Sequence, residues 1–200
     1  MTTKSVGGIR HNYGVNSPRS DDLARILRGH VFVDETKTKD YVVAASTLLP
    51  NNVGAARKAL RGQLLPGQDR IHFAKEGNRY RHRVLGTMCE LDVQVTLYIA
   101  ATRDERAGRA ACLNAVLDDV IKDRAASLVV ERDESLMKSD LELISRRLYP
   151  VNDKPTYRLE APRAEPLLWI SDAVAWCFQR GGEWTKACQP LISDRRRLEL

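Results

Sequence analysis

The sequence predicts an α/β fold in which a mixed sheet of about five strands is covered by helices. Two apolar runs, 31–35 and 41–49, are separated by the polar turn TKTKD, as in adjacent antiparallel strands. Further along the chain, apolar strand-like runs alternate with longer helical patterns, which is typical of strands joined through helices. The chain has 200 residues, of which 43% are hydrophobic and 29% charged, enough for one domain with a substantial core.

The later strands are predicted from alternation and from β-branched residues. The clearest is 92–101, where Val93, Val95, Leu97 and Ile99 lie on one face. Shorter strands are expected at 71–74, 127–133 and 156–160.

Helices are predicted where apolar residues recur with a helical period between capping and terminating residues. The helix at 104–126 has acids in its first turn and Lys122 and Arg124 in its last, which matches the helix dipole at both ends. The other expected helices are 21–29, 51–65, 78–91, 135–148 and 164–182.

The chain is divided into three predicted parts. Residues 1–29 form an N-terminal arm with a short helix, because glycines and a proline interrupt hydrophobic periodicity there. Residues 30–192 form the folded domain. Residues 193–200, with Arg195, Arg196 and Arg197, are predicted to be a flexible basic tail.

Charge and composition favour some partners and disfavour others. The formal charge of +6 favours a polyanion such as nucleic acid. No apolar run is long enough to span a membrane, and the first residues, MTTKSVGG, lack the apolar segment of a secretory signal, which predicts a cytoplasmic protein. The four widely spaced cysteines contain no C-x-x-C pair and are expected to be reduced core thiols.

Acidic residues occur where burial is expected. Asp34 ends an apolar strand, Glu131 and Asp133 end another, and Asp172 interrupts the apolar helix LLWISDAVAWCF. An unpaired buried carboxylate costs several kcal/mol, so such groups are normally paired or bound to a metal. Structural alternatives exist for each acid. Asp172 or Ser171 can cap a helix, or Asp172 can be held by an arginine. The three strand-end acids can lie where their strands reach water.

The motifs VFVDET and LLWISDAVAW, with a hairpin into a second apolar strand between them, resemble a widespread bacterial and phage family of uncharacterised proteins. The similarity spans roughly residues 31–180. It implies a ribonuclease H-like fold with an integrase-like or resolvase-like nuclease core, in which acids from the first strand, a later strand and the last helix surround Mg²⁺ or Mn²⁺.

Carried over by position, the resemblance implies that Asp34, Asp133 and Asp172 are the metal ligands, with Glu131 the less favoured choice for the middle position. The helix at 51–65 contains no acid, so the helical glutamate of true ribonuclease H has no counterpart there. Glu35 is a candidate to replace it, although adjacent strand residues point to opposite faces.

Hard oxygen ligands suit Mg²⁺, and two such ions can activate water and stabilise the leaving oxygen of a phosphodiester. The catalytic candidates are therefore Asp34, Glu131, Asp133 and Asp172. His72 is an auxiliary candidate for proton transfer or phosphate contact, and simple packing or exposure is its alternative.

Basic residues are concentrated in two neighbouring helices, where they could follow a sugar-phosphate backbone. Tyr80 would be available for base stacking, and the alternative is a solvated helix surface. The candidates are Arg57, Lys58, Arg61, Arg79, Tyr80, Arg81 and Arg83.

Two functions follow from these observations. The first is a metal-dependent nuclease that hydrolyses RNA or DNA through the carboxylates. The second is a noncatalytic module of the same fold that binds nucleic acid or protein in a phage or mobile element. The oligomeric state is left open, a homodimer included.

Overall fold

The computed structural model describes residues 28–200; the predicted helix at 21–29 and nearly all of the predicted arm lie outside the described residues. The sheet is mixed, with the order β5-β4-β1-β2-β3-β6. Its strands are β1 (His30–Thr36), β2 (Tyr41–Leu48), β3 (Gln94–Ala100), β4 (Ser127–Glu131), β5 (Thr156–Glu160) and β6 (Ile192–Leu198).

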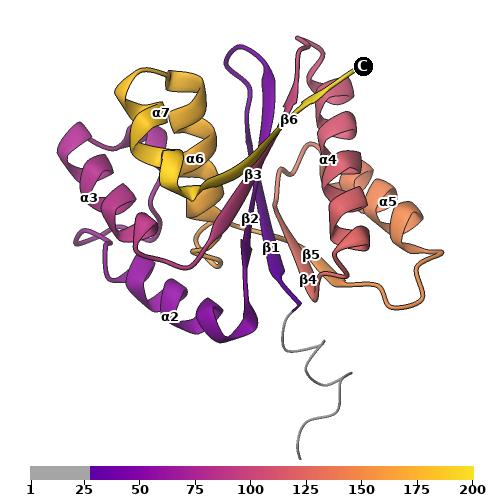
Figure 1. Ribbon diagram of the computed structural model, residues 1–200, viewed down its shortest axis with the longest axis horizontal. Coiled ribbons are helices and arrows are strands. Elements are labelled where there is room, and N and C mark those ends of the chain that lie inside the picture. The colour runs from indigo at the N-terminus through magenta and orange to yellow at the C-terminus, as the bar shows by residue number, and fades with distance from the viewer. Residues whose placement is uncertain (1–27) are drawn as a thin grey trace, which may run out of the picture.

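Helices cover both faces of this sheet, as Figure 1 shows: α2, α3, α6 and α7 lie on one side, and α4 and α5 lie on the other. Two 3₁₀ turns, Phe73–Lys75 and Gln189–Leu191, complete the first layer. The helices are α2 (Pro50–Arg61), α3 (Asn78–Cys89), α4 (Glu105–Lys122), α5 (Met137–Leu148), α6 (Leu168–Arg180) and α7 (Glu183–Cys188).

The connections are those of a ribonuclease H-like fold, so the predicted fold class is confirmed. β1, β2 and β3 form an antiparallel meander. β4 then pairs in parallel with β1 on its other side, and β5 pairs in parallel with β4. Parallel pairing brings the C-terminal ends of β1 and β4 side by side at the same end of the sheet, with Val33 opposite Val130.

Helix α6 is attached to the centre of the sheet by a buried polar contact. Ser171 is fully buried, and its hydroxyl donates to the Phe32 carbonyl at 2.9 Å and lies 2.9 Å from the Ser46 hydroxyl. Because an unsatisfied buried hydroxyl is costly, these bonds fix where α6 crosses β1 and β2. The position of the next residue, Asp172, is fixed with it.

The strand predicted at 71–74 is wrong. Ile71 and Phe73 are buried in the core beside α6, but Phe73–Lys75 is a 3₁₀ turn. The Arg81 side chain donates to the carbonyls of Phe73 and Ala74, at 2.8 and 2.7 Å, and so takes the place of a neighbouring strand. Apolar residues occur there because the turn packs against the core, not because it joins the sheet.

The flexible tail predicted at 193–200 is also wrong, because residues up to Leu198 form β6, which pairs in parallel with β3. Its central arginines are largely exposed, so main-chain pairing rather than apolar alternation holds this edge strand. Arg196 also pairs with Asp119 at 2.6 Å. The sheet therefore has six strands instead of about five, and α7, which was not predicted, precedes the sixth.

The helices and cysteines of residues 28–200 bear on two of the expectations. None of the helices there combines the length and apolar character that crossing a bilayer requires. Three cysteines are buried, as expected of core thiols, whereas Cys89 is exposed.

A close contact between α4 and β2 gives a stability prediction. A Cβ on Gly108 would lie 2.6 Å from Cβ and 2.8 Å from Cγ of Tyr41, so we expect Gly108→Ala to destabilise the fold by about 1–3 kcal/mol. The control is Gly86→Ala in α3, where nothing lies within 4 Å of the added Cβ. That change should stabilise by about 0.5–1 kcal/mol. Urea unfolding measures both, and equal effects would contradict the close approach.

Candidate functional site

Three acids from separate elements line one cavity of about 390 Å³ at the edge of the sheet. Asp34 lies near the end of β1, Glu131 is the last residue of β4, and Asp172 lies in the second turn of α6. The parallel pairing of β1 with β4 places the first two next to each other, and the packing of α6 across β1 adds the third. Asp34 and Asp172, which the sequence analysis grouped together, thus line the same cavity.

Asp34 and Glu131 lie next to each other as a pair of acids. Asp34 is only 6% exposed, and burial, followed by its hydrogen bond to the Glu131 carboxyl group, raises its pKa well above the ordinary value. Burial likewise raises the pKa of Glu131. The Asp34 carboxyl group also accepts a 2.7 Å hydrogen bond from the Glu35 backbone N–H, which fixes its orientation.

Asp172 stands opposite this pair and is not a helix cap, since α6 begins four residues earlier. Its Oδ2 accepts a 3.0 Å hydrogen bond from the Phe73 backbone N–H and lies 3.8 Å from Nδ1 of His72. Burial raises the pKa of Asp172 despite these two neighbours. No arginine forms an ion pair with Asp172 within residues 28–200, so the purely structural alternative of an arginine clamp finds no partner there.

His72 lines the same cavity and is partly exposed. Partial burial lowers its pKa, the charge of Asp172 opposes that effect, and the cation Arg70 adds to it. The ring is therefore largely neutral near pH 7 and is able to accept a proton beside Asp172. Arg70 also lines the cavity and was not singled out from the sequence; its position two residues before His72 was the available signal.

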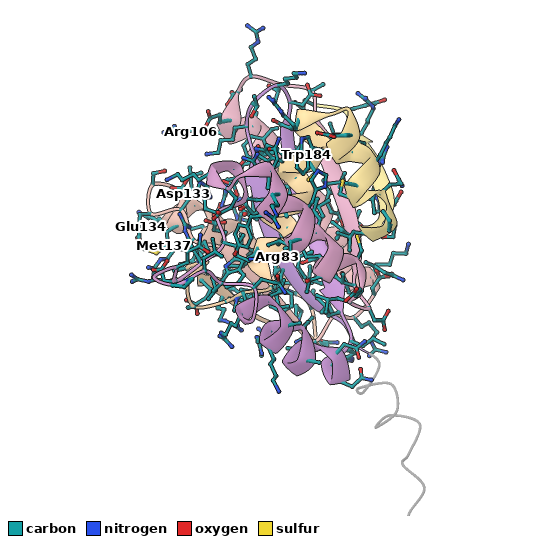
Figure 2. The ribbon with its side chains drawn as sticks, turned by 90° about the vertical axis from the view of Figure 1, so that its left-hand side faces the viewer. Arg83, Arg106, Asp133, Glu134, Met137 and Trp184 are labelled. Atoms are coloured by element: carbon teal, nitrogen blue, oxygen red, sulfur yellow. The ribbon has the colours of Figure 1, made fainter. Side chains whose placement is uncertain are left out.

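Asp133 belongs to the rim of the cavity and not to the acid pair. β4 ends at Glu131, and the Asp133 carboxylate accepts hydrogen bonds from the Ser135 backbone N–H at 2.9 Å and hydroxyl at 2.6 Å. These bonds lower the pKa of Asp133, and Lys37 lies 3.8 Å away. Figure 2 shows Asp133 beside Glu134 toward the margin of the molecule. The predicted strand to 133 is too long, because β4 ends at Glu131 and the chain then enters the turn at 134–136.

Glu35 does not fill the place of the missing helical acid. Its Oε1 lies 2.6 Å from Nη1 of Arg109, a buried arginine on α4 that also binds Asp140 on α5. Arg109 thus neutralises Glu35 on the other face of the sheet, as expected from strand alternation. The charge of Glu35 still adds to the rise in the pKa of Asp34.

The residues of the predicted basic face have different surroundings. Arg57 is half-buried and forms a two-pronged ion pair with the buried Glu165, whereas Lys58 and Arg61 are exposed. The Tyr80 hydroxyl donates to the Gln63 carbonyl, and the Arg83 guanidinium lies over the Tyr80 ring at 4.8 Å, so that ring is already covered.

The second basic helix is divided between two hollows. Arg79, Tyr80 and Arg83 line a shallow one on the outer side of α3. Arg81 faces a separate cavity beside Trp176. Arg83 and Trp184, from α3 and α7, mark this helical layer in Figure 2.

Carboxylate oxygens are suitable ligands for a hard divalent cation, but the side chains at this site are not positioned to coordinate one. Asp34, Glu131 and Asp172 supply only oxygen atoms, and burial raises the pKa of all three carboxyl groups. Within the described chain, however, no group of three or more His, Cys, Asp or Glu side chains is positioned to hold a metal ion. Binding a cation at these residues would require the Asp34–Glu131 hydrogen bond to open and the side chains to turn toward it.

Comparison with known proteins gives structural similarities only. No family model matches the sequence, and no curated protein matches it significantly. Among solved structures, the chain is similar to a chain of the PCNA:RNase HII complex from Archaeoglobus fulgidus, with 9% identity, 77% of this chain and 73% of that chain covered, and a TM-score of 0.49.

It is also similar to Bst-RNase HIII in complex with Mn²⁺, with 12% identity and a TM-score of 0.42. That alignment covers 79% of this chain and 55% of the other, so the chain spans about half of the length of Bst-RNase HIII. With TM-scores below 0.5, the description of the fold rests on the strand order of the chain itself.

Proposed function

We propose that the protein is a divalent-metal-dependent phosphodiesterase that hydrolyses nucleic acid. The observation that carries this proposal is the convergence of Asp34, Glu131 and Asp172, from β1, β4 and α6, on one cavity. Acids at the core are normally neutralised by a partner, whereas Asp34 has Glu131 and Asp172 among its charged neighbours, and both raise its pKa. Perturbed titratable groups gathered in a cavity are typical of functional sites.

In this proposal Asp34, Glu131 and Asp172 would hold Mg²⁺ or Mn²⁺, with Glu131 taking the middle position in place of Asp133. Such ions, when bound, polarise phosphoryl oxygen and lower the pKa of water. The chain's own groups do the rest: the Phe73 backbone N–H orients Asp172, and the His72 ring beside it receives a proton. Arg70, on the same cavity, offers a positive charge to a phosphate.

The sequence motifs VFVDET and LLWISDAVAW support the same proposal from another direction, because they contain two of the three acids. We propose on this basis that the chain belongs with the uncharacterised bacterial and phage proteins that it resembles. Nucleic acid, RNA or DNA, is the proposed partner, and Mg²⁺ or Mn²⁺ the proposed cofactor.

A noncatalytic nucleic-acid-binding module is the rival function, and two observations favour it. No group of three or more His, Cys, Asp or Glu side chains within residues 28–200 is positioned to hold a metal ion, and Glu35, although it lines the cavity, is paired with Arg109. The rival predicts nucleic-acid binding that survives substitution of all three acids. The phosphodiesterase predicts loss of turnover with part of the binding retained.

The deciding experiment is a cleavage assay of the full chain on single-stranded, duplex, hybrid and branched substrates, with Mn²⁺, Mg²⁺ or EDTA. Loss of a direct metal contact costs several kcal/mol of transition-state stabilisation, so Glu131→Gln should reduce the cleavage rate by at least about 100-fold. Asp133→Asn is the matched control from the rim of the cavity and should change the rate by less than about fivefold.

Two results would contradict the proposal. One is the absence of metal-dependent cleavage on every substrate. The other is the reverse order of the variants, with Asp133→Asn inactive and Glu131→Gln active, which would return the middle position to Asp133.

A further inference from the structure

A second cavity, of about 550 Å³, adjoins the carboxylate cavity. Thr36, Ala74 and Trp176 line both hollows, so the two share a wall. The second cavity continues between the turn that joins β1 to β2 and the helices α3, α6 and α7. None of the three proposed metal-binding acids reaches it, so its chemistry differs from that of the first.

The lining of this second cavity is rich in cations without acidic partners. Lys39, Arg81 and Arg180 all contribute to it, and none of them forms an ion pair with another residue of the range 28–200. Glu183 is the one acid among its lining residues in that range. The excess positive charge suits an anionic ligand.

One of these cations, Arg81, is held in place before any ligand arrives. The Arg81 guanidinium lies 4.3 Å from the centre of the Trp176 ring and donates to the Asn78 side chain at 2.8 Å, in addition to its bonds to the 3₁₀ turn. A guanidinium fixed in this way loses little conformational entropy when a ligand binds beside it.

The β1–β2 turn that carries Lys39 is fixed as well. The Gln179 side chain accepts a 2.9 Å hydrogen bond from the Thr38 backbone N–H and donates to the Asp40 carbonyl at 2.6 Å. These bonds tie residues on both sides of Lys39 to α6. The wall of the cavity is therefore built from fixed elements, with only the Lys39 and Arg180 side chains left to adjust.

We propose that the second cavity binds one nucleotide of a single-stranded segment, adjacent to the phosphodiester that lies at the carboxylates. This inference rests on the proposed function in taking nucleic acid as the substrate. Lys39 and Arg180 contact the phosphates, and the hollow beside Trp176 and Arg81 receives the base. A single strand is specified because a base reaches a cavity only when it is unstacked, whereas a duplex presents its backbone.

The test measures binding without cleavage. Wild-type protein and Lys39→Ala/Arg180→Ala are titrated in EDTA into a fluorescent single strand of about 12 nucleotides and into the matching duplex, with anisotropy as the readout. We expect the double variant to bind the single strand about tenfold more weakly. Its log–log salt slope should fall by about 1.4, for two lost phosphate contacts on a single strand.

The matched control is Lys122→Ala/Arg146→Ala, which removes the same charge from exposed positions at the end of α4 and on α5, across the sheet. It should change single-strand affinity by less than about twofold, because distant exposed charges are screened by salt. A second readout is the quenching of tryptophan emission by the single strand, which Trp176→Phe should reduce, with the remainder coming from Trp184 in the same cavity.

The outcomes separate this inference from the proposed function. Binding that depends on Lys39 and Arg180 supports the cavity whether or not the protein cleaves. Equal losses in the two double variants, duplex binding at least as tight as single-strand binding, or no binding at all would each overturn it. Cleavage that is lost in Glu131→Gln while single-strand binding persists would show that the two cavities act separately.

Discussion

Replacing Asp34 by asparagine should abolish metal-dependent cleavage and at the same time make the folded protein more stable at neutral pH. Asparagine keeps the oxygen that accepts the hydrogen bond from the Glu35 backbone N–H, so the local geometry should survive. It removes a charge that is 6% exposed and faces Glu131 and Asp172. We expect at least about a 1000-fold loss of rate, as for the loss of about 4 kcal/mol of transition-state stabilisation.

The stability gain should depend on pH in a definite direction. Burial and the contact with Glu131 raise the pKa of Asp34 in the folded state above its value in the unfolded chain. Stability from this group is therefore fully present at low pH, below the ordinary aspartate range, and is lost as the pH rises through the folded-state pKa. Asparagine stays neutral, so the variant should melt higher than wild type at pH 7–8 by about 2–8 °C and almost equally near pH 4.

Melting curves at several pH values, with and without Mn²⁺, test this expectation. Mn²⁺ should raise the melting temperature of wild type and have little effect on Asp34→Asn, because a ligand that binds only the folded state stabilises it. Glu142→Gln, at an exposed position on α5, is the charge-matched control and should show neither effect. A variant that melts lower than wild type at pH 8 would mean that the charge of Asp34 is already compensated.

The stability gain and the loss of cleavage share one cause. An acid that costs stability in the folded state is retained when it is useful, and functional sites are where local rules of burial are broken. The same reasoning made Asp34 and Asp172 recognisable from the sequence, since both interrupt apolar patterns. Their convergence required the topology as well, because nothing local relates β1 to α6.

The prediction chose Asp133 over Glu131 for a reason that lies in strand length. Alternation places both residues on one face if the strand continues to 133, but β4 ends at Glu131. Asp133 then bonds to Ser135 and shapes the turn toward α5. The ends of strands are the least certain part of a prediction from sequence. Here the end of β4 decides which acid lies beside Asp34.

The helices and strands with a strong apolar periodicity were predictable. Those that depend only on main-chain hydrogen bonds were not. The strand around Val95 and Leu97 and the helices on either side follow from their apolar patterns. β6 has no such pattern, because its arginines lie at the exposed edge of the sheet. The turn at Phe73 has the composition of a strand but takes its hydrogen bonds from Arg81, a contact that no short window of sequence contains.

Replacing Arg109 by methionine should be the most destabilising single change in the described chain that this structure suggests. Arg109 is 5% exposed and binds Asp140 through Nε and Nη2, with its Nη1 at 2.6 Å from Glu35 and 3.1 Å from the Tyr41 hydroxyl. Methionine fills similar space but leaves the buried Asp140 carboxylate without a cation and Glu35 with only Lys37, 3.8 Å away. Breaking such a network costs about 3–5 kcal/mol, which corresponds to about 6–20 °C in melting temperature for a chain of this size.

Three further variants show whether the lost charge or the lost packing of Arg109 causes the destabilisation. Arg106→Met removes an exposed arginine of the same helix and should shift the melting temperature by less than about 2 °C. Arg109→Lys keeps the charge but not the planar fork that meets Asp140, so it should recover only part of the loss. Adding Asp140→Asn to Arg109→Met removes one stranded carboxylate, and the double variant should therefore be more stable than Arg109→Met alone. If the two are equally unstable, the charge of Asp140 is not the cause of the loss, and the role of Arg109 is packing between α4 and α5.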